Sequence, residues 1–453
     1  MTMWTLTFSA LRRNRAIFLA TYLNLFLGGA ILTGFASLYE SGAAPGLAKA
    51  DRDTLQTMAM VIGGWGALII GFGTAATLTL AVRQRERQIA LLKAAGALPG
   101  QIRRMILVET ATLLAASAIP ATPTGMALGR AVMAALKSTH QVSGGVGYRF
   151  GSTALAIGFG DIVLAATVAA AVAGRRAAGR GTAAALVASS TDDPPMSRKR
   201  KIWAVVLLGL GANAAVMVAT MMKDEGYSTM SVAGQASILT ALGLALLAPV
   251  LIRWTAAVLS PLMRRGGGYL AEAELRRHSR QAAGVLMPVI LFVALANGAL
   301  YQQFIQDDAN RAAHLVPSAD DKGVQTLSFL IVGMIALFAA VVVANVAVAS
   351  TLHRRREFGQ RRLIGDTPAQ VCRSLGWEAS AVLVAGLMFG TLAALAGVMP
   401  FSYAKTGQWL PDQGPWVFIG VAATVTAVTV AACLGAARQA LRTPALAAVG
   451  AAT

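Results

Sequence analysis

Long uncharged stretches alternate with short basic ones along almost the whole chain. An apolar run of ~20 residues is long enough to cross a bilayer as an α-helix. We expect spans at residues 16–39, 54–82, 110–129, 152–174, 202–222, 226–252, 281–306, 323–352, 379–404 and 413–437. Because these runs are continuous rather than alternating, they predict helices and not the strands of a membrane barrel. The predicted fold is therefore an all-α polytopic membrane protein with about ten transmembrane helices.

The basic residues between these runs predict the orientation of the chain. Ten spans return it to the side on which it began. With the N-terminus in the cytoplasm, 30 of the 39 Lys and Arg residues fall in cytoplasmic segments. This bias follows the positive-inside rule of membrane proteins. We therefore expect a multi-pass protein with both termini in the cytoplasm.

The net charge of +19 does not indicate a nucleic-acid-binding protein. The basic residues lie at helix ends on one side, where topology and attraction to anionic lipid already explain them. The two cysteines, Cys372 and Cys433, predict no disulfide framework. The four histidines match no metal-ligand spacing. We therefore expect contact with membrane lipid, no nucleic acid and no metal site.

The polar segment between the second and third predicted spans occurs twice. Residues 85–109 align without a gap with residues 354–378, at a constant offset of 269. The matching pairs are Arg87 and Arg356, Lys93 and Arg362, Gly96 and Gly365, Pro99 and Pro368, Gln101 and Gln370, Arg104 and Arg373, and Glu109 and Glu378. A repeat of this length changes the fold prediction for the whole chain, so we interpret the sequence as a duplication.

The duplication divides the predicted spans into three groups. We expect a first four-helix repeat over residues 1–186, a linker with two connector helices over residues 187–265, and a second four-helix repeat over residues 266–453. An even number of inserted spans leaves both repeats in the same orientation. They should therefore be related by an axis along the membrane normal and not by inversion.

The first copy of the polar segment resembles the FtsX-like permease family, the MacB-type (type VII) membrane subunits of ABC transporters. The resemblance rests on Glu86, residues 89–93, residues 96–97, residues 101–104 and Glu109. The second copy has drifted, with residues 358–362 in place of the apolar run and Asp366 in place of a small residue. The resemblance covers essentially the whole chain, without the large extracellular domain that is common in the family. It implies a subunit of the bacterial cytoplasmic membrane that is not itself an enzyme and works with a separate ABC ATPase.

The repeated segment has the properties of a docking helix. Ile89 and Leu92 fall at helical spacing, so a short helix can present an apolar edge to a groove of the partner, with flanking charges that set the register. We expect Arg361 in the second copy to offer an exposed charge instead. The residues predicted to dock the ATPase are Arg87, Ile89, Leu92, Lys93, Gly96, Pro99 and Gln101, and Arg356, Phe358, Arg362, Gly365, Pro368 and Gln370.

Three acidic residues form a second set of candidates. Asp161 is the only acid deep inside a predicted span, and an ionisable residue there is a functional candidate by default. Thr167 or a neighbouring helix offers a purely structural explanation, as a hydrogen-bond partner. Glu109 and Glu378 lie at the start of equivalent spans, where we expect pairing with arginines of the preceding segment.

The absence of a nucleotide-binding motif shapes the functional prediction. The sequence contains no G-x-x-x-x-G-K-[ST] pattern, so ATP and Mg²⁺ are expected on the separate ATPase, and no cofactor in this chain. Two docking segments predict two ATPase copies per chain. Short external connections favour export of an amphipathic or hydrophobic substrate, whether drug, peptide or lipid. The alternatives are a non-transporting transmembrane mechanotransducer and, with Asp161 alone to support it, an ion-coupled secondary transporter.

Overall fold

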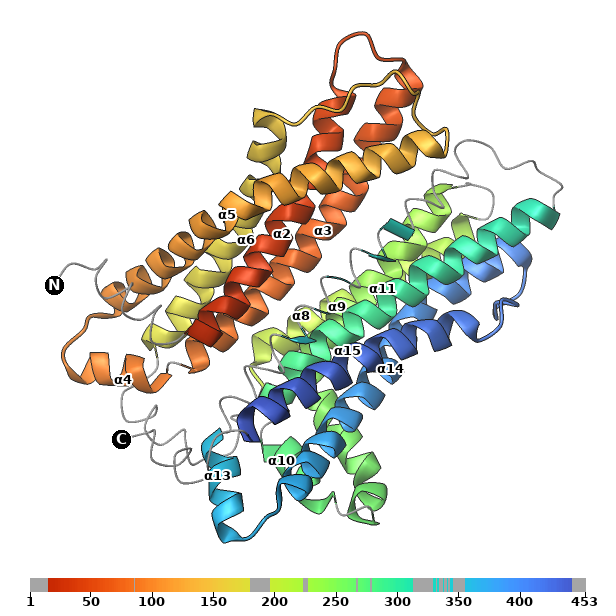
Figure 1. Ribbon diagram of the computed structural model, residues 1–453. Coiled ribbons are helices and arrows are strands. Elements are labelled where there is room, and N and C mark those ends of the chain that lie inside the picture. Colours follow the sequence, from red (N-terminus) through yellow and green to blue (C-terminus); the bar gives the residue numbers. More distant parts are fainter. Residues whose placement is uncertain are drawn as a thin grey trace. The chain divides into compact units, whose positions relative to one another are not determined.

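The computed structural model describes residues 15–84, 86–179, 196–222, 227–265, 268–277, 279–312, scattered positions from 329 to 344, and 355–441. Every regular element in these ranges is an α-helix (Figure 1). The helices are α2 (Arg15–Gly42), α3 (Lys49–Gln84), α4 (Glu86–Ala94), α5 (Pro99–Ser138), α6 (Ser152–Gly179), α8 (Arg198–Met221), α9 (Tyr227–Arg265), α10 (Tyr269–Arg277), α11 (Ser279–Ala312), α13 (Arg355–Ile364), α14 (Pro368–Thr406) and α15 (Trp416–Leu441).

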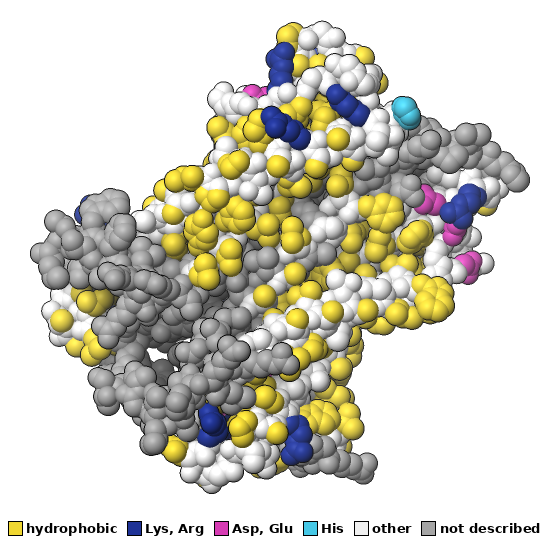
Figure 2. All heavy atoms as spheres, viewed as in Figure 1, with side chains coloured by type: hydrophobic (Ala, Val, Ile, Leu, Met, Phe, Trp, Pro, Cys, Tyr) yellow, Lys and Arg dark blue, Asp and Glu magenta, His cyan; other side chains and the backbone are white. Residues whose placement is uncertain are grey.

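Eight of the described helices are long and apolar enough to cross a membrane, namely α2, α5, α6, α8, α9, α11, α14 and α15. Helix α3 coincides with a further predicted span at residues 54–82. The predicted span at residues 323–352 falls largely outside the described residues. On the face shown in Figure 2, charged side chains gather near helix ends and hydrophobic ones cover the lengths between. The prediction of an all-α polytopic membrane protein is confirmed.

The described helices form two compact units. In the first, α2 packs against α3, α5 and α6. In the second, α11 packs against α14, and α15 contacts both of these helices. The connector helices α8 and α9 also belong to the second unit, where α9 packs against both α11 and α14. The connector is therefore joined to the second repeat by direct helix packing.

Small residues allow the central helices of each unit to approach closely. Ser117, Ala121, Gly125 and Gly129 recur at every fourth position of α5, and all four are buried. The equivalent positions of α14, 269 residues further on, are Gly386, Gly390, Ala394 and Val398; all four are buried, and the first three are small. Such stripes let membrane helices approach closely and gain van der Waals contact. This contact matters because lipid provides no hydrophobic driving force for helix association. The repeat is thus visible in the packing as well as in the sequence.

The end of the first unit remote from α4 is closed by the connection between α5 and α6. The Tyr148 hydroxyl lies 3.0 Å from Ser37 Oγ and 3.1 Å from the carbonyl oxygen of Met126. Glu40 Oε2 accepts hydrogen bonds from the backbone N–H groups of Gly151 at 2.8 Å and of Ala154 at 2.9 Å. A carboxylate at a helix N-terminus satisfies free N–H groups and complements the helix dipole. These bonds hold the connection onto the bundle.

Tyr148 gives this connection a predicted pH dependence. Burial raises the pKa of Tyr148 above its ordinary value of 10.0. The stabilisation linked to the neutral phenol is fully present below pH 10.0, which is the pKa of tyrosine in the unfolded chain. It is lost as the pH rises through the higher pKa of Tyr148 in the folded chain. We expect Tyr148→Phe to lower stability by about 0.5–1.5 kcal/mol at pH 8, through lost hydrogen bonding. Thermal unfolding measured from pH 8 to 11 should show the stability difference between the unaltered chain and Tyr148→Phe becoming smaller. A difference that grows above pH 10 would contradict the role given to the neutral phenol.

Candidate functional site

The two repeated segments have the same local construction. Gly96, whose φ is +92°, lies two residues after the end of α4, and Gly365, whose φ is +120°, directly follows α13. The backbone N–H of Ala97 donates to Leu92 O at 2.9 Å, and that of Asp366 donates to Arg361 O at 3.0 Å. This is the Schellman ending, which requires the left-handed backbone that glycine adopts without strain.

The start of the next helix is also the same in both copies. Pro99 and Pro368 occupy the first turns of α5 and α14, where proline removes no intrahelical hydrogen bond. Gln101 Oε1 accepts from the backbone N–H of Leu98 at 2.9 Å, and Gln370 Oε1 accepts from that of Thr367 at 2.7 Å. The matching glycine, proline and glutamine residues therefore build the turn that positions each short helix. In Figure 1, α4 and α13 each lie at the end of their own bundle.

Each short helix is fixed by one buried apolar side chain. Ile89 packs in a core cluster with Ile102 and Ile106 of α5. At the equivalent positions, Phe358 packs against Val371 and Leu375 of α14. The structure thus turns Ile89 and Phe358 inward, whereas the sequence analysis placed them on the exposed edge. The physical reason is the apolar face that the following helix offers at the same offset in both copies.

The exposed apolar residues differ between the copies. Leu91 is 60% exposed and Leu92 is partly exposed on α4, and Leu98 is exposed in the turn that follows. On α13, the exposed apolar residues are Leu363 and Ile364 at the C-terminal end, and Ile364 is 88% exposed. Sequence reasoning missed Leu363 and Ile364, although two apolar residues directly before Gly365 were a usable signal. Both segments therefore expose an apolar patch, but one helical turn apart.

One charged residue of the second segment, Arg361, forms an ion pair within the chain. Arg361 Nη2 lies 2.6 Å from Glu274 Oε1 of α10, and these side chains are 17% and 16% exposed. Neighbouring Glu272 accepts a hydrogen bond from Ser260 Oγ of α9 at 2.9 Å and pairs with Arg276 at 2.9 Å. The expectation that Arg361 is an exposed charge is thus wrong. Helix α13 is tied through α10 to the connector.

The remaining docking candidates are described less fully. Lys93 and Arg362 are half-buried on their helices. The backbones of Arg87 and Arg356 lie in α4 and α13, but their side chains are outside the described residues. The contribution of these four side chains to docking stays a prediction.

The ion pair between α10 and α13 predicts a specific charge-reversal result. Arg361→Glu places two carboxylates together in a largely buried position. We expect it to destabilise the attachment of α13 by about 1–3 kcal/mol. This cost lies between the cost of breaking an exposed ion pair and the cost of breaking a buried one. The double variant Arg361→Glu with Glu274→Arg should restore most of the loss.

Proteolysis of the short helix, followed over time, measures this change. Arg311→Glu is the control, because its pair with Asp308 is exposed, with 73% and 45% of the side chains accessible, and should contribute ~0–1 kcal/mol. Equal effects of the two reversals, or no rescue by the double variant, would contradict the role of the pair.

The acidic candidates lie in different surroundings. Glu109 is buried on α5, and the equivalent Glu378 is half-buried on α14. Asp161 is half-buried in the middle of α6. Within the described residues, no group of three or more His, Cys, Asp or Glu is placed to hold a metal ion.

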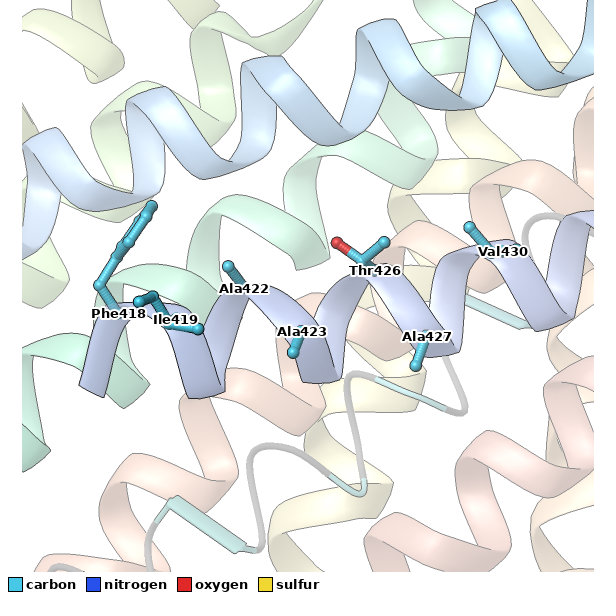
Figure 3. A pocket seen from close by; sticks show the side chains of 7 residues that line it. All are labelled: Phe418, Ile419, Ala422, Ala423, Thr426, Ala427 and Val430. Atoms are coloured by element: carbon cyan, nitrogen blue, oxygen red, sulfur yellow. The ribbon is translucent and has the colours of Figure 1, made fainter. Parts of the chain in front are cut away.

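One apolar hollow lies along α15 and is shown in Figure 3. It has a volume of about 530 Å³. Its described lining consists of Phe418, Ile419, Ala422, Ala423, Thr426, Ala427 and Val430. Thr426 alone among these residues has a polar side chain, so this lining fixes the orientation of no particular ligand.

Comparison with known proteins agrees with the duplication. The family model described as FtsX-like permease C-terminal matches residues 60–181 and residues 329–445, which together make up more than half of the chain. The two matches begin 269 residues apart, the offset that relates the two short segments. Each match contains one short helix, α4 or α13. No curated protein matches the chain.

Proposed function

The chain belongs to the FtsX-like permease family, in a duplicated form, and from this premise we propose that it is the membrane subunit of an ATP-driven exporter. A separate ATPase binds ATP and Mg²⁺ and drives helix movement in this chain. One chain carries both permease repeats, so it works as a pseudo-dimer with two ATPase copies.

The observation that carries this proposal is the equivalence of α4 and α13. Both helices are followed by a glycine of positive φ, both are anchored on the next long helix, and both expose apolar residues. The anchoring helix is 40 residues long in one copy and 39 in the other. At 1.5 Å per residue such a helix spans ~60 Å, about twice the hydrocarbon thickness. Force applied at either short helix therefore acts on a helix that continues from the tight turn into the membrane.

The short connections support an amphipathic or hydrophobic substrate. Between α2 and α3 the connection covers residues 43–48, between α5 and α6 residues 139–151, and between α14 and α15 residues 407–415. None of these described connections is long enough to form a domain that could grip an external partner. A substrate that partitions into the bilayer needs no such domain, since it reaches the helices through the lipid. This supports export over mechanotransduction.

The test is reconstitution with the partner ABC ATPase, identified by its co-purification with this chain. The two proteins are co-purified, placed in lipid nanodiscs, and assayed for ATP turnover with a panel of hydrophobic peptides and drugs. We expect at least one member to stimulate turnover. An intact complex whose turnover no member changes would argue against export and favour a transducer.

A further inference from the structure

Helix α6 has one packed face and one open face. A methyl group at Gly158 would lie 2.6 Å from the backbone of Thr33 on α2, and Ile162 and Ala166 are fully buried. The opposite face carries exposed Ile157, Leu164 and Val168, of which Leu164 is 65% exposed. These three residues follow the spacing of a single helical stripe.

Asp161 lies on this open stripe, four residues after Ile157 and three before Leu164. It is the tenth residue of α6, so it lies ~14 Å along the helix from the first residue. The hydrocarbon core is ~30 Å thick, and the span Ser152–Arg175 has a mean hydropathy of 2.1. The carboxyl group is therefore near the middle of the membrane.

Nothing in the described part of the chain hydrogen bonds to or pairs with Asp161. Thr167 is six residues further on, and side chains six apart do not meet on one helix. The position next to Asp161 is open, because a Cβ at Gly160 would meet no heavy atom within 4 Å. The carboxyl group of Asp161 thus has no partner among the described residues, lies next to an open helix surface at Gly160, and has apolar side chains above and below it.

An ionised carboxylate in apolar surroundings is unfavourable, so it either takes up a proton or is stabilised by a counter-charge or a polar contact. An amphipathic cation offers both a counter-charge for Asp161 and an apolar surface for the exposed side chains of the stripe. Its charge pairs with the carboxylate, and its apolar body packs on Ile157, Leu164 and Val168. A Cβ at Gly160 would meet no protein atom within 4 Å, so the helix surface next to Asp161 is open to a ligand.

We propose that Asp161 and the surrounding apolar stripe of α6 form a binding site for amphipathic cations within the membrane. This inference rests on the proposed function and names the substrate class as hydrophobic compounds with an ammonium or phosphonium group. Neutral and anionic compounds of the same size bind there weakly.

Binding is tested on the full chain without its ATPase, in nanodiscs of zwitterionic lipid. The probe is tetraphenylphosphonium, which keeps its charge at every pH. Tetraphenylborate is its counterpart of similar size and opposite charge. Equilibrium dialysis against empty nanodiscs gives the protein-dependent part. We expect saturable binding of the phosphonium to the unaltered chain, a loss of at least tenfold in affinity for Asp161→Asn, and near-normal affinity for Asp161→Glu.

Asp53→Asn is the matched control, because Asp53 is an exposed carboxylate near the start of α3. It should leave phosphonium binding unchanged, and no variant should improve binding of tetraphenylborate to the level of the phosphonium. Equal phosphonium binding by Asp161→Asn and the unaltered chain, or loss of binding in Asp161→Glu as complete as in Asp161→Asn, would overturn the site. Because the assay contains no ATPase, an absence of substrate-stimulated ATP turnover counts against the exporter and leaves this binding result intact.

Discussion

A Leu92→Glu variant is expected to lose binding of the ATPase at α4. Leu91 and Leu92 are exposed, while Ile89 on the same short helix is buried against α5. Burying one leucine in a partner groove contributes ~1.5–3 kcal/mol. A glutamate in that groove removes this contribution and adds an unpaired charge in apolar surroundings. Since a tenfold change in affinity corresponds to ~1.4 kcal/mol, the loss at this site is about tenfold or more.

The control uses the other docking helix. Ile364→Glu changes the most exposed apolar residue of α13, and it should weaken the second site alone. Pull-down of the ATPase should give partial retention with either variant and none with both together. Because both positions are exposed, we expect the thermal unfolding of each variant to be unchanged. This result would show that the fold is intact. Full retention by the double variant would exclude these patches as docking surfaces.

The second large effect is expected from Gly125→Leu, which should strongly destabilise the packing of α2 against α5 in the first unit. A Cβ at this position would lie 2.8 Å from the carbonyl oxygen of Ala30 and would clash with Thr33 Oγ1. The side chain of Thr33 can rotate, but the backbone of α2 cannot move without separating from α5. Overpacking of this kind costs about 1–3 kcal/mol or more.

Gly420→Leu is the control for this change. Gly420 lies in α15, where a Cβ would meet nothing within 4 Å, so leucine there should be neutral or slightly stabilising through helix propensity. The yield of monodisperse protein in detergent and the thermal midpoint distinguish the two variants. Equal stability of both would show that the contact between α2 and α5 does not depend on glycine.

Much of the fold was predictable, because a helix that crosses a lipid bilayer needs a long apolar run, which is easily recognised in the sequence. The ends of the helices were less so. Helix α5 begins at Pro99, but the predicted span begins only at residue 110. The prediction began late because the first turns of α5 carry Arg103 and Arg104. A rule based on apolar runs stops at such charges, although a helix that continues out of the bilayer accepts them readily.

The two turns next to the short helices were predictable, but the orientation of the helices was not. Gly96, Gly365 and the following prolines marked the two turns because those backbone conformations restrict the residue type. The buried direction of Ile89 was hidden, since α4 has apolar residues on both of its faces. The pair between Arg361 and Glu274 joins residues 87 apart in the chain, and no local pattern reveals such a contact.

The measurement that bears most directly on this account is the mass of the intact complex with its ATPase. If the two repeats form a pseudo-dimer with one docking helix each, native mass spectrometry should give one copy of this chain with two copies of the ATPase. A complex with two copies of this chain and two of the ATPase would show that the repeats do not act as the two halves of one transporter.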